Sequence, residues 1–256
     1  LDEMSMVDVK LFQALIAALR YSCRIIMVGD ADQLPSVGPG NILGEVIRSG
    51  LVPTVCLNEI FRQAARSLIV ENAHHIISSE PLQKGGRTDD FFFLESDGDA
   101  ARKLVCDLVT TRLPRSYGFN PIRDIQVLCP TKLGPTGTQA LNVELQNLLN
   151  PEQKGKPQLQ SASRVFRVGD KVMQVRNNYE IIWNRIGGEQ GVGAYNGDIG
   201  IVESINPRDR SMVVRMDDRR LIYPAENLGE LEIAYAITVH KSQGSEFPAV
   251  ILPVAQ

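Results

Sequence analysis

The stretch VGDADQLPSVGPGN, residues 28–41, decides how the start of this chain is organised. It places two acids, an amide, two prolines and three glycines directly after the apolar run RIIMV at 24–28. Ordering such a loop costs much conformational entropy, and glycine loses the most. We therefore expect the loop to hold a ligand. The alternative is a turn-rich connection that uses Gly and Pro for ordinary geometry.

The residues around this loop predict an open α/β sheet. From Asp8 onward, apolar residues recur at i, i+3, i+4 and i+7, which is the spacing of a helix packed on a core. RIIMV follows as a nearly continuous apolar strand, typical of a parallel strand covered on both faces. Ligands of such sheets bind beyond the carboxyl ends of the strands, where Asp2-Glu3 and Asp30-Asp32 fall.

Paired carboxylates at the end of a buried strand suit a magnesium nucleotide. One carboxylate can hold the hydrated Mg²⁺ while its neighbour orients an attacking water. Gln33, an uncharged amide a few residues beyond the strand, can both sense a phosphate and polarise a water. Acidic pairs also arise by chance in a chain with 30 Asp and Glu residues, so Asp2-Glu3 alone does not establish catalysis.

Taken together, two stretches resemble helicase signature motifs. The opening LDEMSMVD, followed by VGDADQLPSVGPGN, is similar to the second and third motifs of superfamily 1 helicases, in the RecD-like branch that moves 5′ to 3′ on DNA. This resemblance implies that Asp2 binds the Mg²⁺ of ATP, that Glu3 is the catalytic base and that Gln33 senses the γ-phosphate. It also implies that Asp30 contacts the nucleotide and Pro35 the DNA.

The next segment carries a candidate arginine for the nucleotide. A helix that Asn41 is predicted to cap and a short strand TVCL at 54–57 lead to NEIFRQA. In the family, an arginine after an aromatic residue at this place reaches the γ-phosphate from the second motor domain, and Arg62 matches it. A fixed planar cation neutralises the charge that develops on a transferred phosphoryl group. A solvated arginine at a helix start would fit the same residues.

A second α/β domain is predicted from residue 59 to 163. Helical periodicity at 68–77 and 101–109 alternates with predicted strands FFFLE at 91–95 and IQVLCP at 125–130, and a further helix follows.

The strand-end loop in LCPTKLGPTGTQALNVELQ resembles a family motif that lines the DNA channel. The resemblance makes Thr131 and Lys132 backbone-phosphate contacts, with Asn142 nearby. A Gly/Pro turn with a solvated lysine would give the same pattern.

Short alternating runs broken by Asn-Gly, Gly-Asp and Asp-Arg turns begin after a polar linker at 151–163. They predict a small antiparallel barrel of SH3 type at 164–230, inserted into the second motor domain. GDKVMQVRNNY and NGDIGIV resemble the inserted barrel of RecD-like helicases. Arg176, Asn178 and Tyr179 are candidate contacts to single-stranded DNA, with Tyr179 offering a stacking face. A structural spacer is the alternative.

After the barrel, TVHKSQGSEF matches the fifth helicase motif over ten contiguous residues, within a strand, short helix, strand pattern. A helix N-terminus there offers unpaired N–H groups to phosphate. By resemblance, the residues facing the DNA backbone are Thr238, His240, Lys241 and Ser242, and those nearer the nucleotide are Gln243, Gly244 and Glu246.

These assignments predict an α/β fold with RecA-like parallel sheets and an inserted SH3-type antiparallel barrel. The predicted bounds are 1–58 for the first motor domain, 59–163 with 231–256 for the second, and 164–230 for the barrel.

Composition agrees with a globular protein, with 43% hydrophobic and 22% charged residues. The net charge of −3 means that any nucleic-acid site is a local groove. The four cysteines contain no C-x-x-C pair, and we interpret them as buried, reduced thiols. No apolar run approaches the roughly 20 residues of a membrane span, so we expect a cytoplasmic protein with no membrane contact.

The phosphate loop G-x-x-x-x-G-K-[ST] and the final arginine motif of the family do not occur in these 256 residues. We therefore expect a fragment of an ATP- and Mg²⁺-dependent DNA helicase of recombination and repair, inactive alone as an ATPase. Expected partners are single-stranded DNA, a duplex with a 5′ overhang, and other exodeoxyribonuclease V subunits. The alternatives are the helicase region of a conjugative relaxase, a Pif-type helicase, and a non-catalytic DNA-binding scaffold on a helicase fold. The direction of travel rests on family analogy alone.

Overall fold

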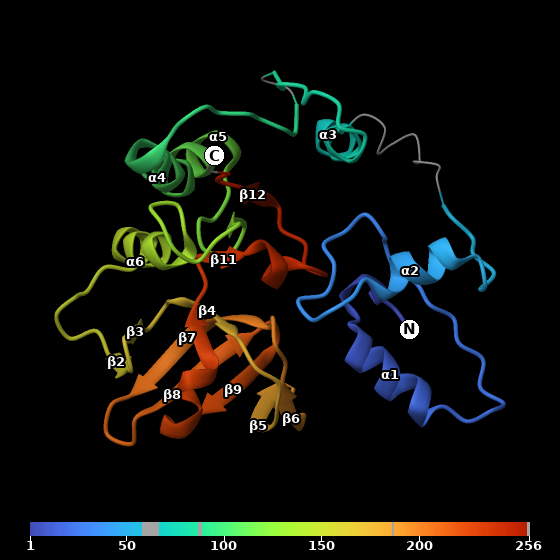
Figure 1. Ribbon diagram of the computed structural model, residues 1–256. Coiled ribbons are helices and arrows are strands. Elements are labelled where there is room, and N and C mark those ends of the chain that lie inside the picture. Colours follow the sequence, from blue (N-terminus) through green and yellow to red (C-terminus); the bar gives the residue numbers. More distant parts are fainter. Residues whose placement is uncertain (58–66, 87–88, 186, 255–256) are drawn as a thin grey trace. The chain divides into compact units, whose positions relative to one another are not determined.

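The computed structural model describes residues 1–57, 67–86, 89–185 and 187–254, and it contains two compact units, Leu1–Glu95 and Ser96–Gln256 (Figure 1). The domain boundary predicted at 58/59 falls outside the described residues and stays a prediction. Within the described part of the chain, every helix is too short or too polar to span a membrane.

Capped helices connected by extended segments make up the first unit. Asp8 begins the first long helix, because its Oδ1 accepts a hydrogen bond from Leu11 N at 2.7 Å. The predicted cap Asn41 does the same for Gly44 N at 3.1 Å. The helices in the described residues of this unit are η1 (Met4–Met6), α1 (Val9–Ala18), α2 (Ile42–Ser49) and α3 (Leu68–Ile77).

The strands predicted in the first unit are not formed. Residues 24–28, 54–57 and 91–95 are irregular in the structure. Side chains in all three runs are exposed, with Val55 at 87%. A regular strand needs a hydrogen-bonded partner strand, and an apolar run does not by itself supply one. The prediction of regular strands was therefore wrong at these places.

The run at 24–28 nevertheless pairs with the start of the chain. Leu1 N donates to Ile26 O at 2.8 Å, Val28 N donates to Leu1 O at 2.8 Å, and Met4 N donates to Val28 O at 3.0 Å. These two extended segments run side by side in the same direction, as the predicted sheet requires.

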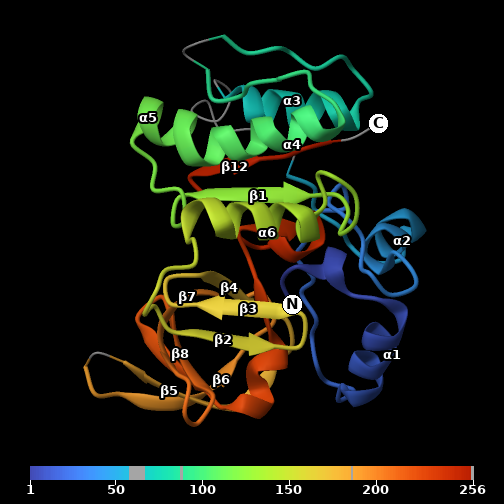
Figure 2. The same ribbon diagram turned by 90° about the vertical axis from the view of Figure 1, so that its left-hand side faces the viewer.

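A parallel sheet lies at the centre of one half of the second unit. Strand β1 (Ile125–Cys129) pairs with β11 (Ala236–Thr238) on one side and with β12 (Ala249–Ile251) on the other. Figure 2 shows β1 and β12 side by side, with helix α6 (Thr138–Leu149) next to them. Side chains of α6 and of α4 (Gly98–Asp107) pack with β1 in one core. Beyond α4 the chain continues through the π-helical turn η3 (Leu108–Arg112) into α5 (Leu113–Tyr117).

The predicted inserted β region is an antiparallel sheet of seven strands in the order β10-β4-β7-β8-β9-β5-β6. Among the described residues no pairing joins the edge strands β10 and β6, so the sheet is open rather than a closed barrel. Alternate side chains of these strands bury one core. The bounds are β4 (Lys171–Gln174), β5 (Asn178–Arg185), β6 (Gln190–Ala194), β7 (Ile199–Asn206), β8 (Ser211–Met216), β9 (Arg219–Tyr223) and β10 (Leu231–Ile233), with the 3-10 turn η4 (Ala225–Glu230) before β10.

Part of the predicted linker is a paired strand, and the segment around Trp183 is one as well. Within the predicted linker 151–163, β2 (Gln158–Ser161) pairs with β3 (Arg164–Arg167). Trp183 lies in the β5–β6 hairpin, packs against the core of the antiparallel sheet, and has the Arg185 guanidinium 5.4 Å from its ring centroid.

The antiparallel and parallel sheets are joined by a very short connection. Ala234 and Tyr235 are the two residues between β10 of the antiparallel sheet and β11 of the parallel sheet. A buried carboxylate, Asp170, ties this joint together, since it accepts hydrogen bonds from Tyr235 OH at 3.0 Å and from α6 through Gln146 Nε2 at 2.6 Å. Asp170 also accepts from Asn150 Nδ2 at 2.6 Å and from the Arg167 backbone N–H at 2.7 Å.

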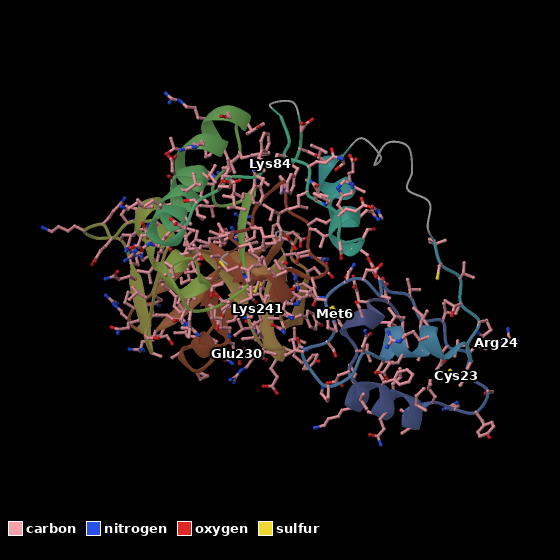
Figure 3. The ribbon with its side chains drawn as sticks, turned by 45° about the horizontal axis from the view of Figure 1, so that its top comes forward. Met6, Cys23, Arg24, Lys84, Glu230 and Lys241 are labelled. Carbon is pink, nitrogen blue, oxygen red and sulfur yellow. The ribbon has the colours of Figure 1, made fainter. Side chains whose placement is uncertain are left out.

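The cysteines divide between the two units. Cys106 and Cys129 are buried as predicted, and burial raises the pKa of their thiols to about 11 and about 12. Cys23 and Cys56 are exposed, which contradicts the prediction, because the strands expected around them are not formed. Figure 3 labels Cys23 beside Arg24 in the irregular segment after α1.

Candidate nucleotide and DNA sites

The two acidic clusters of the first unit lie at neighbouring segment ends. The hydrogen bonds that join Leu1 and Met4 to residues 26–28 bring Asp2-Glu3 alongside Gly29-Asp30. A Cβ on Gly29 would stand 3.0 Å from Met4 N, which real Cβ atoms rarely approach. Glycine at this position therefore permits the close approach of the two segments.

Glu3, the predicted base, has an unusual backbone conformation. Its φ of 54° and ψ of 41° are left-handed, a region that non-glycine residues seldom enter. Its N–H is fixed by Asp2 Oδ1 at 2.9 Å, and both side chains are exposed. Strained backbone of this kind often accompanies functional sites, where surrounding structure maintains it.

The loop at 28–41 is held largely by the protein itself. Ser36 Oγ donates to the Gly38 and Gly40 carbonyls at 3.0 and 3.2 Å, and Pro39 O accepts from Val9 N at 3.0 Å. A Cβ on Gly38 would overlap the Asp8 carboxylate. The second half of the loop is thereby fixed against the start of α1.

The first half of the loop presents the predicted ligand contacts to solvent. Asp30 Oδ1 accepts from Asp32 N at 2.9 Å, and the Asp30 carbonyl accepts from Gln33 N at 3.4 Å. The Gln33 side chain and Pro35 are exposed. Arg62, the fourth predicted catalytic residue, lies outside the described residues.

In the second unit, two predicted DNA motifs emerge from the same sheet edge. β1 and β11 are parallel neighbours, and their register aligns Cys129 with Thr238. The Pro-Thr-Lys loop after β1 and the segment η5 (Val239–Ser242) after β11 therefore leave the sheet side by side. Lys132 and His240 are exposed there, and Lys241 is partly exposed. This places the polar side chains predicted from separate motifs on one edge.

A carboxylate organises the cations at this edge. Glu232 accepts from Lys241 Nζ at 3.0 Å and from Arg164 Nη2 at 3.1 Å. Burial acts to raise the pKa of Glu232, but the hydrogen bond and charge of Lys241 and the charges of Arg164 and Lys132 outweigh it and hold that pKa below its usual range. Lys241 is labelled among the packed side chains in Figure 3.

Some predicted contacts have hydrogen bonds within the protein. Both ends of the Asn142 carboxamide bind the backbone of Ala236 at 2.8 Å, so Asn142 joins α6 to β11 and we omit it from the DNA interface proposed below. Thr131 Oγ1 donates to Leu133 O at 2.9 Å, and Ser242 Oγ donates to Val239 O at 2.7 Å.

The residues predicted nearer the nucleotide follow η5. Gly244 has a φ of 73°, which glycine adopts without cost, and the chain turns there toward β12. Glu246 is exposed and Gln243 is partly buried. Their predicted contact with nucleotide stays a prediction.

Asn178, predicted as a DNA contact in the barrel, is bound to Glu230. Its Nδ2 lies 3.0 Å from both carboxylate oxygens, and its Oδ1 accepts from Glu180 N at 2.9 Å. Burial acts to raise the pKa of Glu230, but hydrogen bonds from Asn178, Asn227 and Gln174 outweigh it and lower that pKa. Glu230, labelled in Figure 3, is thus an acceptor that orders the start of β5.

An exposed pair of tyrosines lies next to this point. Tyr179 is 65% exposed, and its ring centroid is 6.1 Å from that of Tyr195, which is 46% exposed. Asn177 connects the two, since its Oδ1 accepts from Asn196 N at 2.8 Å and its Nδ2 donates to Tyr179 OH at 3.4 Å. Sequence reasoning missed Tyr195, although its position in the turn AYNGD, one residue before Asn-Gly, could have indicated exposure.

Three family models match the chain. They are the SH3 domain of ATP-dependent RecD-like DNA helicases at residues 141–216, an AAA domain at 1–95, and the C-terminal domain of UvrD-like helicases at 233–256.

Curated relatives match along essentially the whole chain. The ATP-dependent RecD2 DNA helicase of Deinococcus radiodurans is 32% identical over 250 residues, which cover 98% of this chain and 31% of that protein. The RecBCD enzyme subunit RecD of Mycobacterium tuberculosis H37Rv is 28% identical, covering 100% of this chain and 44% of that protein. The matched part of the chain therefore spans 31% and 44% of the lengths of these two relatives.

Among solved structures, the Pif1 helicase from Bacteroides in complex with ADP-AlF3 and single-stranded DNA shares the fold. The TM-score is 0.55 at 21% identity, and the match covers 100% of this chain and 64% of that chain.

A parallel sheet with polar strand-end loops, joined to an SH3-type insertion, is the architecture of this chain. The matched domains and the relatives are consistent in one respect. Along essentially its whole length the chain is similar to RecD-like helicases.

Proposed function

We propose that this chain is the DNA-tracking part of a DNA helicase that couples ATP hydrolysis to movement along single-stranded DNA and to duplex unwinding. The observation that carries the proposal is the parallel register of β1 and β11, which brings the Pro-Thr-Lys loop and the TVHKSQG segment to one edge. Similarity to a relative that is named as a DNA helicase supports it independently.

The DNA interface proposed here combines phosphate and base contacts. Lys132, His240 and Lys241 supply positive charge and N–H donors for the DNA backbone, together with Thr131, Thr238 and Ser242. Phosphate contacts of this kind position a strand without reading its sequence. In the antiparallel sheet, Arg176 and Tyr179 add a cation and a stacking face, and Tyr195 extends that face.

The nucleotide site proposed here uses the acidic ends in the first unit. The described residues contain no group of three or more His, Cys, Asp or Glu side chains that could hold a metal ion. This agrees with Mg²⁺ that arrives with ATP, because Mg²⁺ commonly takes one or two carboxylates and completes its shell with phosphates and water. Asp2 would hold that ion, which would neutralise charge on the phosphates.

The remaining steps of hydrolysis fall to side chains of this chain. Glu3 would accept the proton of the attacking water, and Gln33 would orient that water and contact the γ-phosphate. Arg62 would neutralise developing charge on the phosphoryl group. Asp30, Gln243, Gly244 and Glu246 would line the nucleotide, and Pro35 the DNA.

The biological setting follows the relatives. We propose 5′ to 3′ movement, a substrate with a single-stranded 5′ end, a role in recombination and repair, and a cytoplasmic location where DNA and ATP are both present. A protein named as the RecD subunit of the RecBCD enzyme is among the relatives, which supports association with further subunits. The fold shared with Pif1 keeps a Pif-type helicase as the second candidate.

Hydrolysis of ATP by the whole protein that contains this chain, with and without single-stranded DNA, tests the motor. We expect DNA to stimulate hydrolysis and Glu3→Gln to reduce it by about 10²–10⁴-fold, the usual contribution of a general base. Glu45→Gln, at an exposed glutamate on α2, is the matched control and should leave the rate unchanged. A soluble protein that binds DNA but hydrolyses no ATP would refute the motor and favour a non-catalytic scaffold.

A further inference from the structure

One carboxylate aligns cations from the two sheets of the second unit. Glu232 lies in β10, where Lys241 and Arg164 occupy its two oxygens at 3.0 and 3.1 Å. Lys241 follows strand β11 of the parallel sheet, whereas Arg164 opens β3 beside the antiparallel sheet. Lys132, from the loop after β1, adds its charge to the same place.

The arrangement leaves an excess of positive charge that solvent can reach. Two cations pair with one carboxylate, Lys132 adds a further positive charge, and the side chains of Arg164, Glu232 and Lys241 are 36%, 35% and 23% exposed. Arg164 is also fixed at a second point, because its Nη1 donates to Leu231 O at 2.9 Å. A guanidinium held this way keeps further N–H donors in a fixed plane.

We propose that Arg164 is a further contact to the phosphate backbone of single-stranded DNA, and that Glu232 is the positioning residue that holds Arg164 and Lys241 ready for it. The inference rests on the proposed DNA-binding function and adds a contact from outside the helicase motifs. Cations that are ordered before DNA arrives lose less side-chain entropy on binding. The β2–β3 strand pair and the parallel sheet would then contact the same DNA strand.

Removing the negative charge of Glu232 distinguishes a positioning role from simple repulsion of phosphate, because the two roles change the DNA affinity in opposite directions. A carboxylate that only repels phosphate weakens DNA binding, so its removal would tighten binding. A carboxylate that positions cations has the opposite effect. In Glu232→Gln the negative charge is lost, and an NH2 donor replaces the oxygen that now faces one of the two cations, so this variant should bind DNA more weakly.

Fluorescence anisotropy of dye-labelled oligo(dT) with the full 256-residue chain, over a series of salt concentrations, measures this directly. We expect Arg164→Gln and Glu232→Gln each to weaken binding about 3- to 10-fold and to lower the slope of log affinity against log salt by about 0.7 for each phosphate that the protein no longer neutralises. The matched controls are Arg220→Gln and Glu203→Gln, because that pair is joined at 2.6 and 2.7 Å on β9 and β7. Both controls should stay within about twofold of the unmodified chain.

Two results overturn the inference: tighter or unchanged binding by Glu232→Gln, or an unchanged salt slope for Arg164→Gln. If thermal unfolding shows that Arg164→Gln does not fold, Arg164→Lys replaces it. This variant keeps the positive charge, so we expect an unchanged salt slope and a lower DNA affinity. Unchanged affinity of Arg164→Lys would then overturn the inference. If the unmodified chain binds no oligo(dT), the proposed function is refuted as well. If the chain binds oligo(dT) and neither substitution changes the affinity, only this inference is refuted.

Discussion

Lys171 introduces a buried amine where the two sheets of the second unit meet, and it should make stability rise with pH. Its Nζ donates to Ile125 O at 3.2 Å and lies 5.8 Å from the Phe247 ring centroid. Burial lowers the pKa of Lys171 to about 8, and the charge of Asp124 offsets this only in part. In the unfolded chain the pKa returns to its ordinary 10.5.

The sign follows from proton counting. Between the two pKa values, the unfolded chain binds a proton that the folded protein has released. Stability rises with pH wherever the unfolded state binds more protons, so it should rise from about pH 8 to about 10.5. At about 1.4 kcal/mol per pH unit the limit is about 3 kcal/mol, of which about 2 kcal/mol falls between about pH 7.5 and 9.5.

Urea unfolding of the unmodified chain and of Lys171→Met across this range tests the prediction. Met has a similar length and no titrating group, so its stability advantage over Lys should shrink by about 2 kcal/mol from about pH 7.5 to 9.5. The comparison cancels other groups, such as Cys106, whose raised pKa acts in the opposite direction. For Lys103→Met, at an exposed lysine on α4, the plot of unfolding free energy against pH should run parallel to that of the unmodified chain. If the plot for Lys171→Met also runs parallel to that of the unmodified chain, the reasoning is refuted.

Three further substitutions test the joints described above by thermal or urea unfolding. Asp170→Ala leaves four donors without their acceptor and should lower the free energy of unfolding by about 3–5 kcal/mol, with a smaller effect for Asp170→Asn. A loss below about 1 kcal/mol would show that Asp170 does not hold this junction together. Asn142→Ala removes both hydrogen bonds to Ala236 and should cost about 2 kcal/mol, so an unchanged midpoint would deny it a structural role. Gly38→Ala should displace the Asp8 cap and cost about 1–2 kcal/mol, and tolerance of Ala there would show that the loop can shift.

The second unit was predictable from sequence because its patterns are local. The apolar run IQVLCP correctly indicated β1. This run forms a regular strand because both of its partner strands, β11 and β12, lie within the described chain. Period-two alternation indicated the antiparallel strands, and the helix predicted after IQVLCP is α6, whose Leu141 and Leu145 are buried. Where periodicity was interrupted, at 151–163, strand β2 was mistaken for part of a linker.

The first unit departs from prediction because strand formation is not local. RIIMV has the composition of a central strand, yet Ile26 is 76% exposed where the described chain supplies one pairing segment. The site residues show the same limit. Motifs indicated Lys241 and Asn178, but the acids that bind them, Glu232 and Glu230, have no motif, and the contact of Glu230 with Asn178 joins residues distant in sequence.

The two-residue link from β10 to β11 has a mechanical meaning. A link of two residues spans at most about 7 Å, so it contains almost no slack. Load placed on the antiparallel sheet, for example by a duplex end pressing against it, reaches the TVHKSQG segment through the covalent backbone. Asp170 braces the same junction against rotation. The inserted sheet is thus joined stiffly to β11, the strand that leads into His240 and Lys241.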